Sequence, residues 1–239
     1  GDCEVVGGWL FDQPVNTWSS FAFVIVGAAI DCITVRRGVS RWFLVLALAS
    51  IVEGLGSVLF HGGATRGGHF VHDLGLFAIA AYFAAWQAAR AAGATPSSRS
   101  KWIGGGVVGA IAIASPLWWI TSDSTNVIVA VLVASIVVSD LLARRRGIGA
   151  VWSPALVVAT VTAIGFWVLG RSDSPLCEPS SPLQPHAVWH VLSALVVLGW
   201  FDRALEVDDP LTAPRLYRRA IDRFVGLVAR GLVRTFHRS

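Results

Sequence analysis

Apolar runs of about 20 residues recur along the whole chain, and they restrict its fold more than any other feature. A helix of that length crosses a bilayer with its backbone groups hydrogen-bonded inside the segment. Charged residues make up only 14% of the 239 residues, against about 25% in soluble domains. The sequence therefore predicts an all-α polytopic membrane protein with seven transmembrane helices. The expected spans are 15–35, 41–61, 69–90, 101–121, 124–143, 151–170 and 186–206.

Basic residues are distributed unevenly over the connections between these spans. The connections "RRGVSR", "RAAGATPSSRSK" and "ARRRGIG" and the chain after residue 202 carry nearly all of the 19 Lys and Arg residues. The alternate connections and the N-terminus carry few. Because positive charge gathers on the cytoplasmic side, the N-terminus is expected outside and the C-terminus in the cytoplasm. This charge pattern accounts for the basic residues. The sequence has no basic patch interleaved with aromatic residues, so nucleic-acid binding is not expected.

Two domains are expected, a seven-span transmembrane domain at 1–206 and a cytoplasmic tail at 207–239. The tail repeats apolar residues at helical spacing, with arginines on the other face. This pattern is typical of an amphipathic basic helix lying on the inner membrane surface. A helix that binds a partner protein is the alternative. The apolar positions are Leu216, Ala220, Phe224, Val228 and Leu232.

Three polar stretches fall at span ends that this topology places on the outer side. They are Glu53, Ser57 and His61 in the second span, His69, His72 and Asp73 opening the third, and His186 and His190 opening the seventh. Two histidines four residues apart on a helix share one face, so they can bind one metal ion, and a third from another helix completes a tripod. Three histidines with one open position are typical of catalytic zinc. The sequence therefore predicts His61, His186 and His190 as metal ligands.

Each of these motifs also has a plainer interpretation. An H-x-x-x-H pair on a helix is more often a packing or surface feature than a metal site. His69 and His72 can lie at a wet interface, and Glu53 can pair with another buried polar group. The metal site is favoured because the shared membrane face follows from the charge pattern of the connections, which does not involve the histidines. Polar groups inside membrane spans are costly and usually functional.

Taken in order, these motifs resemble the alkaline ceramidase family, within the CREST superfamily of seven-span metal-dependent hydrolases that also includes the adiponectin receptors. The matching stretches are "CE" at 3–4, "NTWSS" at 16–20, "SVLFH" at 57–61, Asp73 and "HAVWH" at 186–190. Their order and the span count agree over nearly the whole chain. Jointly the motifs are fairly specific, although each alone would be weak.

The resemblance implies a zinc-dependent hydrolase that cleaves the amide bond of a membrane lipid, as when ceramide gives a sphingoid base and a fatty acid. It implies a zinc ion on the three histidines, with Ser57 and Asp73 close to it. Asp73 would act as the general base and then protonate the leaving amine. Ser57 would hydrogen-bond the reacting oxygen. The spacing from His61 to Asp73 is about one residue longer than in ceramidases, so His69 or His72 can share the role of Asp73.

Ceramidases of animals also carry a calcium site near the N-terminus, and this chain departs from it. Asp2 and Glu4 match the family's pattern, but Val6 and Gln13 stand where further ligands are expected. Calcium takes six to eight oxygen ligands, and this segment offers few, which counts against a calcium site. Polar residues after this segment are expected to brace the zinc site through hydrogen bonds. These are Asn16 and Ser20.

Two of the three cysteines, Cys3 and Cys177, are expected on the outer side. A disulfide between them fits an oxidising exterior and would tie the N-terminal segment to the connection before the seventh span. Cys32 is expected to be a buried apolar residue. A cysteine ligand to the metal is the alternative.

Two other functions are compatible with the same residues. The chain can hydrolyse a different lipid, such as an ester or a phospholipid, or it can be a lipid-binding receptor in which zinc is structural. Turnover of a lipid panel separates them. The single lysine among many Ala, Gly, Val and Arg residues indicates a GC-rich bacterial source. The membrane would then be the bacterial cytoplasmic membrane, with the site toward its outer face, whereas the oligomeric state is left open.

Overall fold

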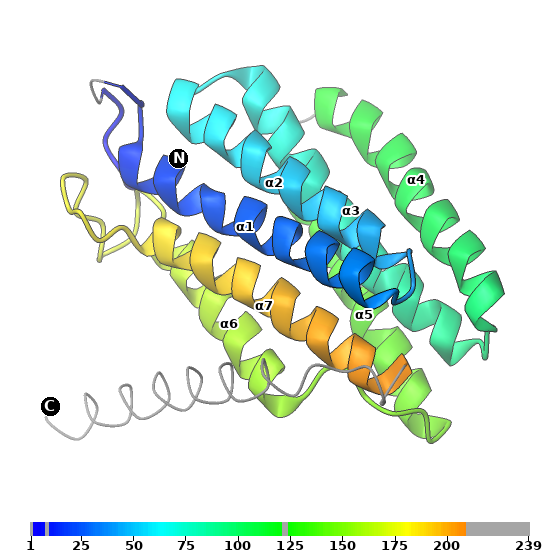
Figure 1. The fold of residues 1–239 in the computed structure, drawn as a ribbon. Coiled ribbons are helices and arrows are strands. Elements are labelled where there is room, and N and C mark those ends of the chain that lie inside the picture. Colours follow the sequence, from blue (N-terminus) through cyan, green and yellow to red (C-terminus); the bar gives the residue numbers. More distant parts are fainter. Residues whose placement is uncertain (1, 8–9, 121–123, 209–239) are drawn as a thin grey trace, which may run out of the picture.

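Seven helices follow one another in the computed structural model, which describes residues 2–7, 10–120 and 124–208 (Figure 1). The helices are α1 (Pro14–Arg37), α2 (Phe43–Gly63), α3 (Arg66–Ala91), α4 (Pro96–Ile120), α5 (Ser124–Arg145), α6 (Pro154–Leu169) and α7 (Pro185–Asp208). Within the described residues there is no strand, and only an isolated bridge pairs Asp2 with Arg171. The predicted tail at 207–239 lies outside the described residues, except for Val207 and Asp208, which end α7.

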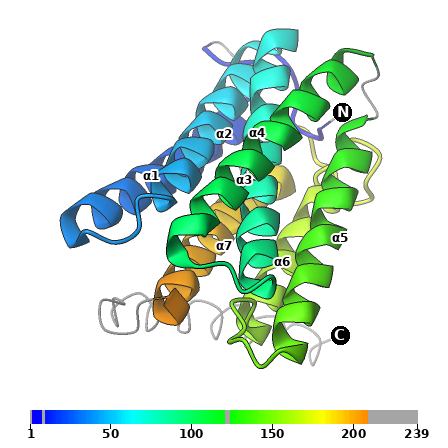
Figure 2. The ribbon, with the colours of Figure 1, turned by 90° about the vertical axis from the view of Figure 1, so that its right-hand side faces the viewer.

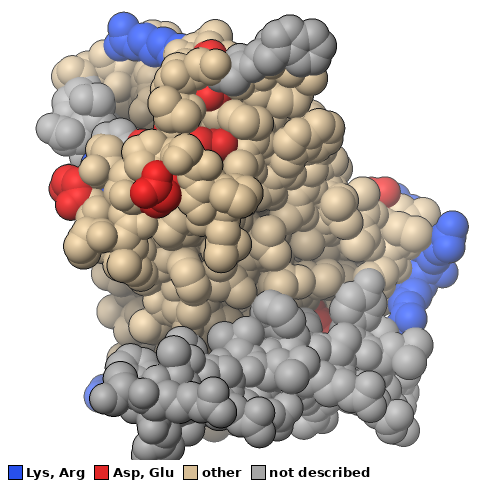
Figure 3. All heavy atoms as spheres, turned by 90° about the vertical axis from the view of Figure 1, so that its left-hand side faces the viewer, with Lys and Arg blue, Asp and Glu red and all other residues tan. Residues whose placement is uncertain are grey.

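Six of these helices are long and apolar enough to cross a membrane. Each lies on an expected span, so the all-helical, multi-span architecture of an integral membrane protein is confirmed. The helix on the sixth span is shorter, at 16 residues. It begins late because the Ser153 side chain caps it by accepting a hydrogen bond from the Leu156 amide, with Pro154 in its first turn. On the face drawn in Figure 3, uncharged side chains make up most of the described surface and the Lys, Arg, Asp and Glu side chains are few.

The bundle is organised around α3 and α7. The α3 helix packs against α2, α4 and α5, while α7 packs against α1 and α6, and α1 joins the two groups by packing on α2 (Figure 2). Large aromatic side chains fill the space between α3 and α7, where the ring centroids of Trp86 and Trp200 are 4.9 Å apart. Both side chains are fully buried. This aromatic layer forms the centre of the core and lies below the polar end of the bundle.

Glycines let α2 and α3 approach closely beside the polar stretches. A Cβ on Gly56 would lie 2.4 Å from the His72 amide nitrogen, and one on Gly75 would lie 2.4 Å from the Glu53 Cα. Small residues are the usual means by which membrane helices come into backbone contact. Here the contact brings Glu53 and His72, which are 19 positions apart in the sequence, side by side.

The chain before α1 lies across the ends of α2 and α7. Its Cys3 amide donates to the Gly170 carbonyl at 2.8 Å, and the Gln13 amide donates to the His61 carbonyl at 2.9 Å. A disulfide joins Cys3 to Cys177 in the connection between α6 and α7, which confirms the predicted pairing. These contacts place the N-terminal segment, the end of α2 and the start of α7 at one end of the bundle (Figure 1).

Candidate metal centre

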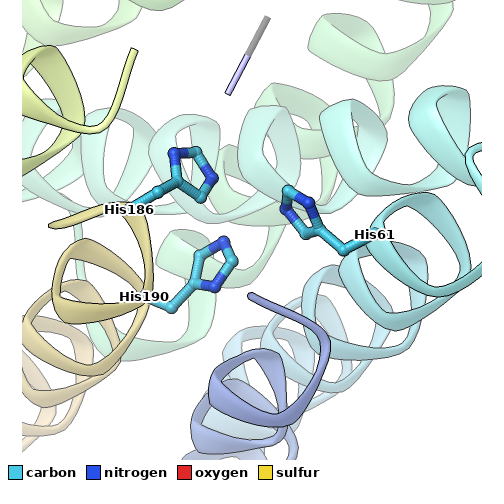
Figure 4. A group of neighbouring side chains, drawn as sticks. All are labelled: His61, His186 and His190. Carbon is cyan, nitrogen blue, oxygen red and sulfur yellow. The ribbon is translucent and has the colours of Figure 1, made fainter. Parts of the chain in front are cut away.

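Three histidines from two helices point toward one another at this end of the bundle (Figure 4). His61 lies in the last turn of α2, and His186 and His190 lie in the first two turns of α7. Each offers a ring nitrogen, and the three nitrogens lie within 4.8 Å of one another. All three side chains are buried. We call this group the histidine tripod, and it could hold a metal ion.

The outward-facing nitrogen of each ring, Nδ1, has a polar neighbour. The Nδ1 of His61 is 2.6 Å from the Oε1 of Gln13, and the Nδ1 of His190 is 2.8 Å from the hydroxyl of Ser19. The Nδ1 of His186 lies 3.4 Å from a carboxylate oxygen of Asp2. Metal-binding histidines usually donate their second ring N–H to such an acceptor, which fixes the tautomer and the ring orientation.

The inward-facing nitrogens fit a metal ion. The Nε2 atoms of His61 and His186 are buried and have no hydrogen-bond partner among the described residues. A buried polar atom without a partner costs free energy, and a cation at the centre of the tripod would supply the missing partner. Three imidazole donors suit zinc but also copper, iron and nickel, so the ligands alone do not determine the metal.

Two serine hydroxyls lie beside the tripod. The Ser57 hydroxyl is 3.4 Å from the Nε2 of His190 and 2.8 Å from the hydroxyl of Ser20. Ser20 in turn donates to the Asn16 carbonyl at 2.7 Å. Ser57 therefore lies next to a ring of the tripod, and Ser20, which is bonded to the Asn16 carbonyl within α1, contacts its hydroxyl.

The carboxylate of Asp73 faces α4 and α5 instead of the tripod. Its Oδ2 accepts hydrogen bonds from the Trp118 indole at 2.6 Å and from the Thr125 hydroxyl at 2.7 Å. His69, one turn earlier and partly exposed, is 3.5 Å from the same oxygen. The catalytic role predicted for Asp73 stays a prediction, because its hydrogen bonds come from outside the tripod.

His72 lies between Asp73 and the tripod. Its Nδ1 is 2.8 Å from the Oε1 of Glu53, which is completely buried, and its Nε2 is 3.9 Å from the Oδ1 of Asp73. The centroid of its ring is 6.3 Å from that of His61. The interpretation of His72 as a residue of a wet interface is wrong, because its side chain is only 9% exposed. For Glu53, the plainer interpretation was that it pairs with another buried polar group, and His72 is such a partner.

Glu4 caps α1. Its two carboxylate oxygens accept hydrogen bonds from the backbone amides of Val15 and Asn16, at 2.7 and 2.8 Å. The first amides of a helix have no partner inside the helix, and the positive end of the helix dipole favours a carboxylate there. Glu4 therefore fixes the start of α1. Because Cys3 and Cys177 form a disulfide, neither is a thiolate ligand.

Several residues of this site were not predicted from the sequence. Gln13 was noted only as a departure from a calcium site, and the contacts of Ser19 and Asp2 with the tripod were not foreseen. A polar residue directly before Pro14, at a helix start, was the one available signal for Gln13. The two groups that hold Asp73 come from the fourth and fifth helices. They are Trp118 and Thr125.

Comparisons with protein-family models and with curated proteins find no match to this chain. The resemblance to alkaline ceramidases therefore depends on the order of the motifs along the chain. To this the structure adds a multi-span helical fold and a buried histidine group that could hold a metal ion. These define the class as a polytopic helical membrane protein with a candidate metal centre.

Proposed function

We propose that the protein is an integral-membrane, zinc-dependent lipid amide hydrolase of the ceramidase type. It would cleave a ceramide-like lipid into a sphingoid base and a fatty acid. The observation that carries the proposal is the buried histidine tripod, in which His61 and His186 have Nε2 atoms without a hydrogen-bond partner. Closed structural zinc sites use four protein ligands, whereas catalytic sites use three and keep a position open.

The three histidines would hold the zinc ion. When bound, zinc supplies a Lewis acid that activates water near neutral pH. Ser57, beside the Nε2 of His190, would donate a hydrogen bond to the oxygen that gains negative charge as the amide carbonyl is attacked. Ser20 orients this hydroxyl from α1.

A proton must reach the leaving amine, and His72 is the group best suited to supply it. Its ring adjoins that of His61, and its Nδ1 is held by Glu53 at 2.8 Å, which leaves Nε2 to exchange a proton. A carboxylate that orients a histidine in this way recurs in hydrolases. Asp73, 3.9 Å from the Nε2 of His72, is the second candidate and would act through that ring.

The substrate would reach the tripod from the membrane. Under the positive-inside rule, the end of the bundle that carries the tripod faces outward, the N-terminus is outside and the C-terminus is cytoplasmic. An outward position gives water access, and a lipid would enter sideways between helices. We assign the protein to a bacterial cytoplasmic membrane, with membrane lipids as its partners and the tail at 207–239 on the inner surface.

A lipid panel tests this proposal on the purified protein in nanodiscs. Ceramides, other N-acyl lipids, ester-linked lipids and phospholipids are incubated with the protein, and released fatty acid is measured by mass spectrometry. We expect release from N-acyl lipids, and loss of release in His186→Ala. Release from esters or phospholipids alone would show that the protein cleaves another lipid bond and would overturn the amide assignment. Bound lipid without any product would favour a receptor with structural zinc.

A further inference from the structure

All three tripod histidines are contacted from the N-terminal part of the chain, although two of them belong to α7 and one to α2. Gln13 and Ser19 are within hydrogen-bond distance of two of the rings, and Asp2 lies beside the third. The side chains that touch the Nδ1 atoms therefore come from one stretch of sequence, and the ligands come from others. This arrangement separates the residues that would bind the metal from those that orient them.

The hydrogen bonds determine which nitrogen of each ring carries the proton. The Oε1 of Gln13 can only accept, so the Nδ1 of His61 must donate. The Ser19 hydroxyl donates its own proton to the Asn16 carbonyl at 2.9 Å, so it accepts from the Nδ1 of His190. In both rings Nε2 is left with its lone pair facing the centre of the tripod, which is the tautomer that binds a metal.

The third ring has an acidic neighbour at Nδ1, but no hydrogen bond. A carboxylate oxygen of Asp2 lies 3.4 Å from the Nδ1 of His186, which has no hydrogen-bond partner among the described residues. Its other oxygen is 3.9 Å from the Nδ1 of His61. Asp2 is held in this place by its neighbour Cys3, whose amide bonds to Gly170 and whose sulfur is joined to Cys177.

Gln13 is the most firmly placed of these residues. It is buried, and its own Nε2 donates to the Glu4 carbonyl at 3.0 Å, which fixes which end of the amide faces His61. The Oε1 that remains lies 2.6 Å from the His61 ring. The Gln13 amide also donates to the His61 carbonyl, so backbone and side chain hold the same residue.

We propose that Gln13 is a positioning residue that sets the metal affinity of the tripod, with Ser19 in the same role at His190. The inference rests on the proposed function, because it takes the tripod to be a metal site. It assigns to the N-terminal segment the task of holding the imidazoles in the metal-binding tautomer before the ion arrives. Residues that orient metal-binding histidines typically contribute about 10- to 100-fold to affinity.

The test measures the zinc dissociation constant by competition with a chelator, on metal-free protein in detergent. Gln13→Leu removes the acceptor at His61 and keeps the volume, and we expect a dissociation constant roughly 10 to 100 times higher. Gln13→Glu keeps an acceptor and should bind zinc more tightly than Gln13→Leu. The matched control is Gln87→Leu, a buried glutamine that bonds to Asp140 in another part of the bundle. It should leave zinc affinity unchanged.

Cobalt provides a second readout that does not depend on turnover. The visible absorption of bound Co²⁺ reports the coordination geometry, and we expect Gln13→Leu to shift it while Gln87→Leu does not. Ser19→Ala is a smaller change that removes the acceptor at His190, and it should also raise the dissociation constant. Ser19 is only partly buried, so Ser19→Ala should disturb folding little. The variant therefore keeps the test decisive even when Gln13→Leu folds poorly.

The outcomes separate the two proposals. Wild-type protein that binds neither zinc nor cobalt would contradict the proposed function itself. Wild-type protein that binds zinc, with Gln13→Leu and Ser19→Ala binding it equally well, would leave the function standing and overturn the positioning role. Equal losses in Gln13→Leu and Gln87→Leu would also overturn it, because the effect would then reflect general stability.

Discussion

At the scale of single residues, the hydroxyl of Ser57 is the most exacting element of the proposed site. It is completely buried, bonded to Ser20 and close to the Nε2 of His190. We expect Ser57→Ala to lower kcat by about 100-fold, as loss of one donor to a developing oxyanion does. Zinc content should not change, because the three ligands remain.

The same helix offers a control for this change. Ser50 is equally buried, but its hydroxyl donates to the Leu46 carbonyl within α2. Ser50→Ala should therefore keep kcat near the wild-type value. An unchanged kcat in Ser57→Ala, measured at saturating lipid, would remove Ser57 from the mechanism.

The pair formed by Glu53 and His72 yields a second residue-scale prediction. Glu53→Gln keeps the shape of the side chain but replaces its carboxylate with a neutral amide. The charged partner at the Nδ1 of His72 is lost, so His72 loses its fixed orientation. We expect kcat to fall by about 100-fold or more, because general acid–base catalysis contributes that much. The KM should stay nearly constant.

Asp73→Asn, measured in parallel, distinguishes the two candidates for proton transfer. If Asp73→Asn abolishes turnover while Glu53→Gln leaves it intact, the role belongs to Asp73, as the motif order predicted. If both variants keep full activity, neither residue transfers the proton.

Residues close together on one helix were the easiest to predict. His186 and His190 are four positions apart, and helix geometry alone puts them on one face. His61 could be added because the charge pattern placed it at the same membrane face. Gln13 and Ser19 could not be found in this way, because their contacts join the residue before α1 and α1 itself to histidines of α2 and α7, and no local spacing encodes them.

At the scale of helices, the close contact between α2 and α3 is the feature that builds the site. In Gly56→Ala, the new methyl carbon would lie 2.4 Å from the His72 amide nitrogen, so one of the two helices would have to move. Overpacking of this kind costs about 1–3 kcal/mol of unfolding free energy, and a backbone clash lies at the upper end. We expect a lower thermal midpoint and displaced Glu53 and His72 side chains.

Gly109→Ala is the matched control for this contact. A Cβ on Gly109, in α4, would meet nothing within 4 Å, and alanine favours the helix. Its thermal midpoint should be equal to or higher than that of the wild type. Equal midpoints for both variants in detergent would show that α2 and α3 are not in backbone contact.

Helix positions were predictable because apolar length determines them, whereas helix neighbours were not. The expected spans and the helices overlap closely, although α4 begins five residues before its expected span and Ser153 and Pro154 delay the start of α6 by three. The α3 helix is buried on most sides, so its apolar residues show no single face that points to a partner. The register of α2 against α3, and with it the pairing of Glu53 with His72, therefore required the three-dimensional structure.

At the scale of the whole molecule, the disulfide ties two distant parts of the sequence together at one end of the bundle. Cys3 and Cys177 are 174 positions apart, and their bond links the N-terminal segment to the connection before α7. Replacing both with alanine should lower the unfolding free energy by about 2–4 kcal/mol. Thermal unfolding under non-reducing conditions measures this.

The remaining cysteine is the control for that experiment. Cys32 lies half-buried in α1 and is free, so Cys32→Ala should unfold close to the wild-type midpoint. A double variant as stable as the wild type would mean that the hydrogen bonds of Cys3 and Val5 to the opposite connection hold the segment without the disulfide.

The central claim is that the histidine tripod binds zinc, and elemental analysis of purified protein tests it most directly. We predict about one zinc ion per chain in wild-type protein purified without added metal, as three histidines in a catalytic site would hold. In His186→Ala and His190→Ala the zinc should be lost while the fold is kept. Wild-type protein without stoichiometric zinc, or variants that keep it, would contradict the account.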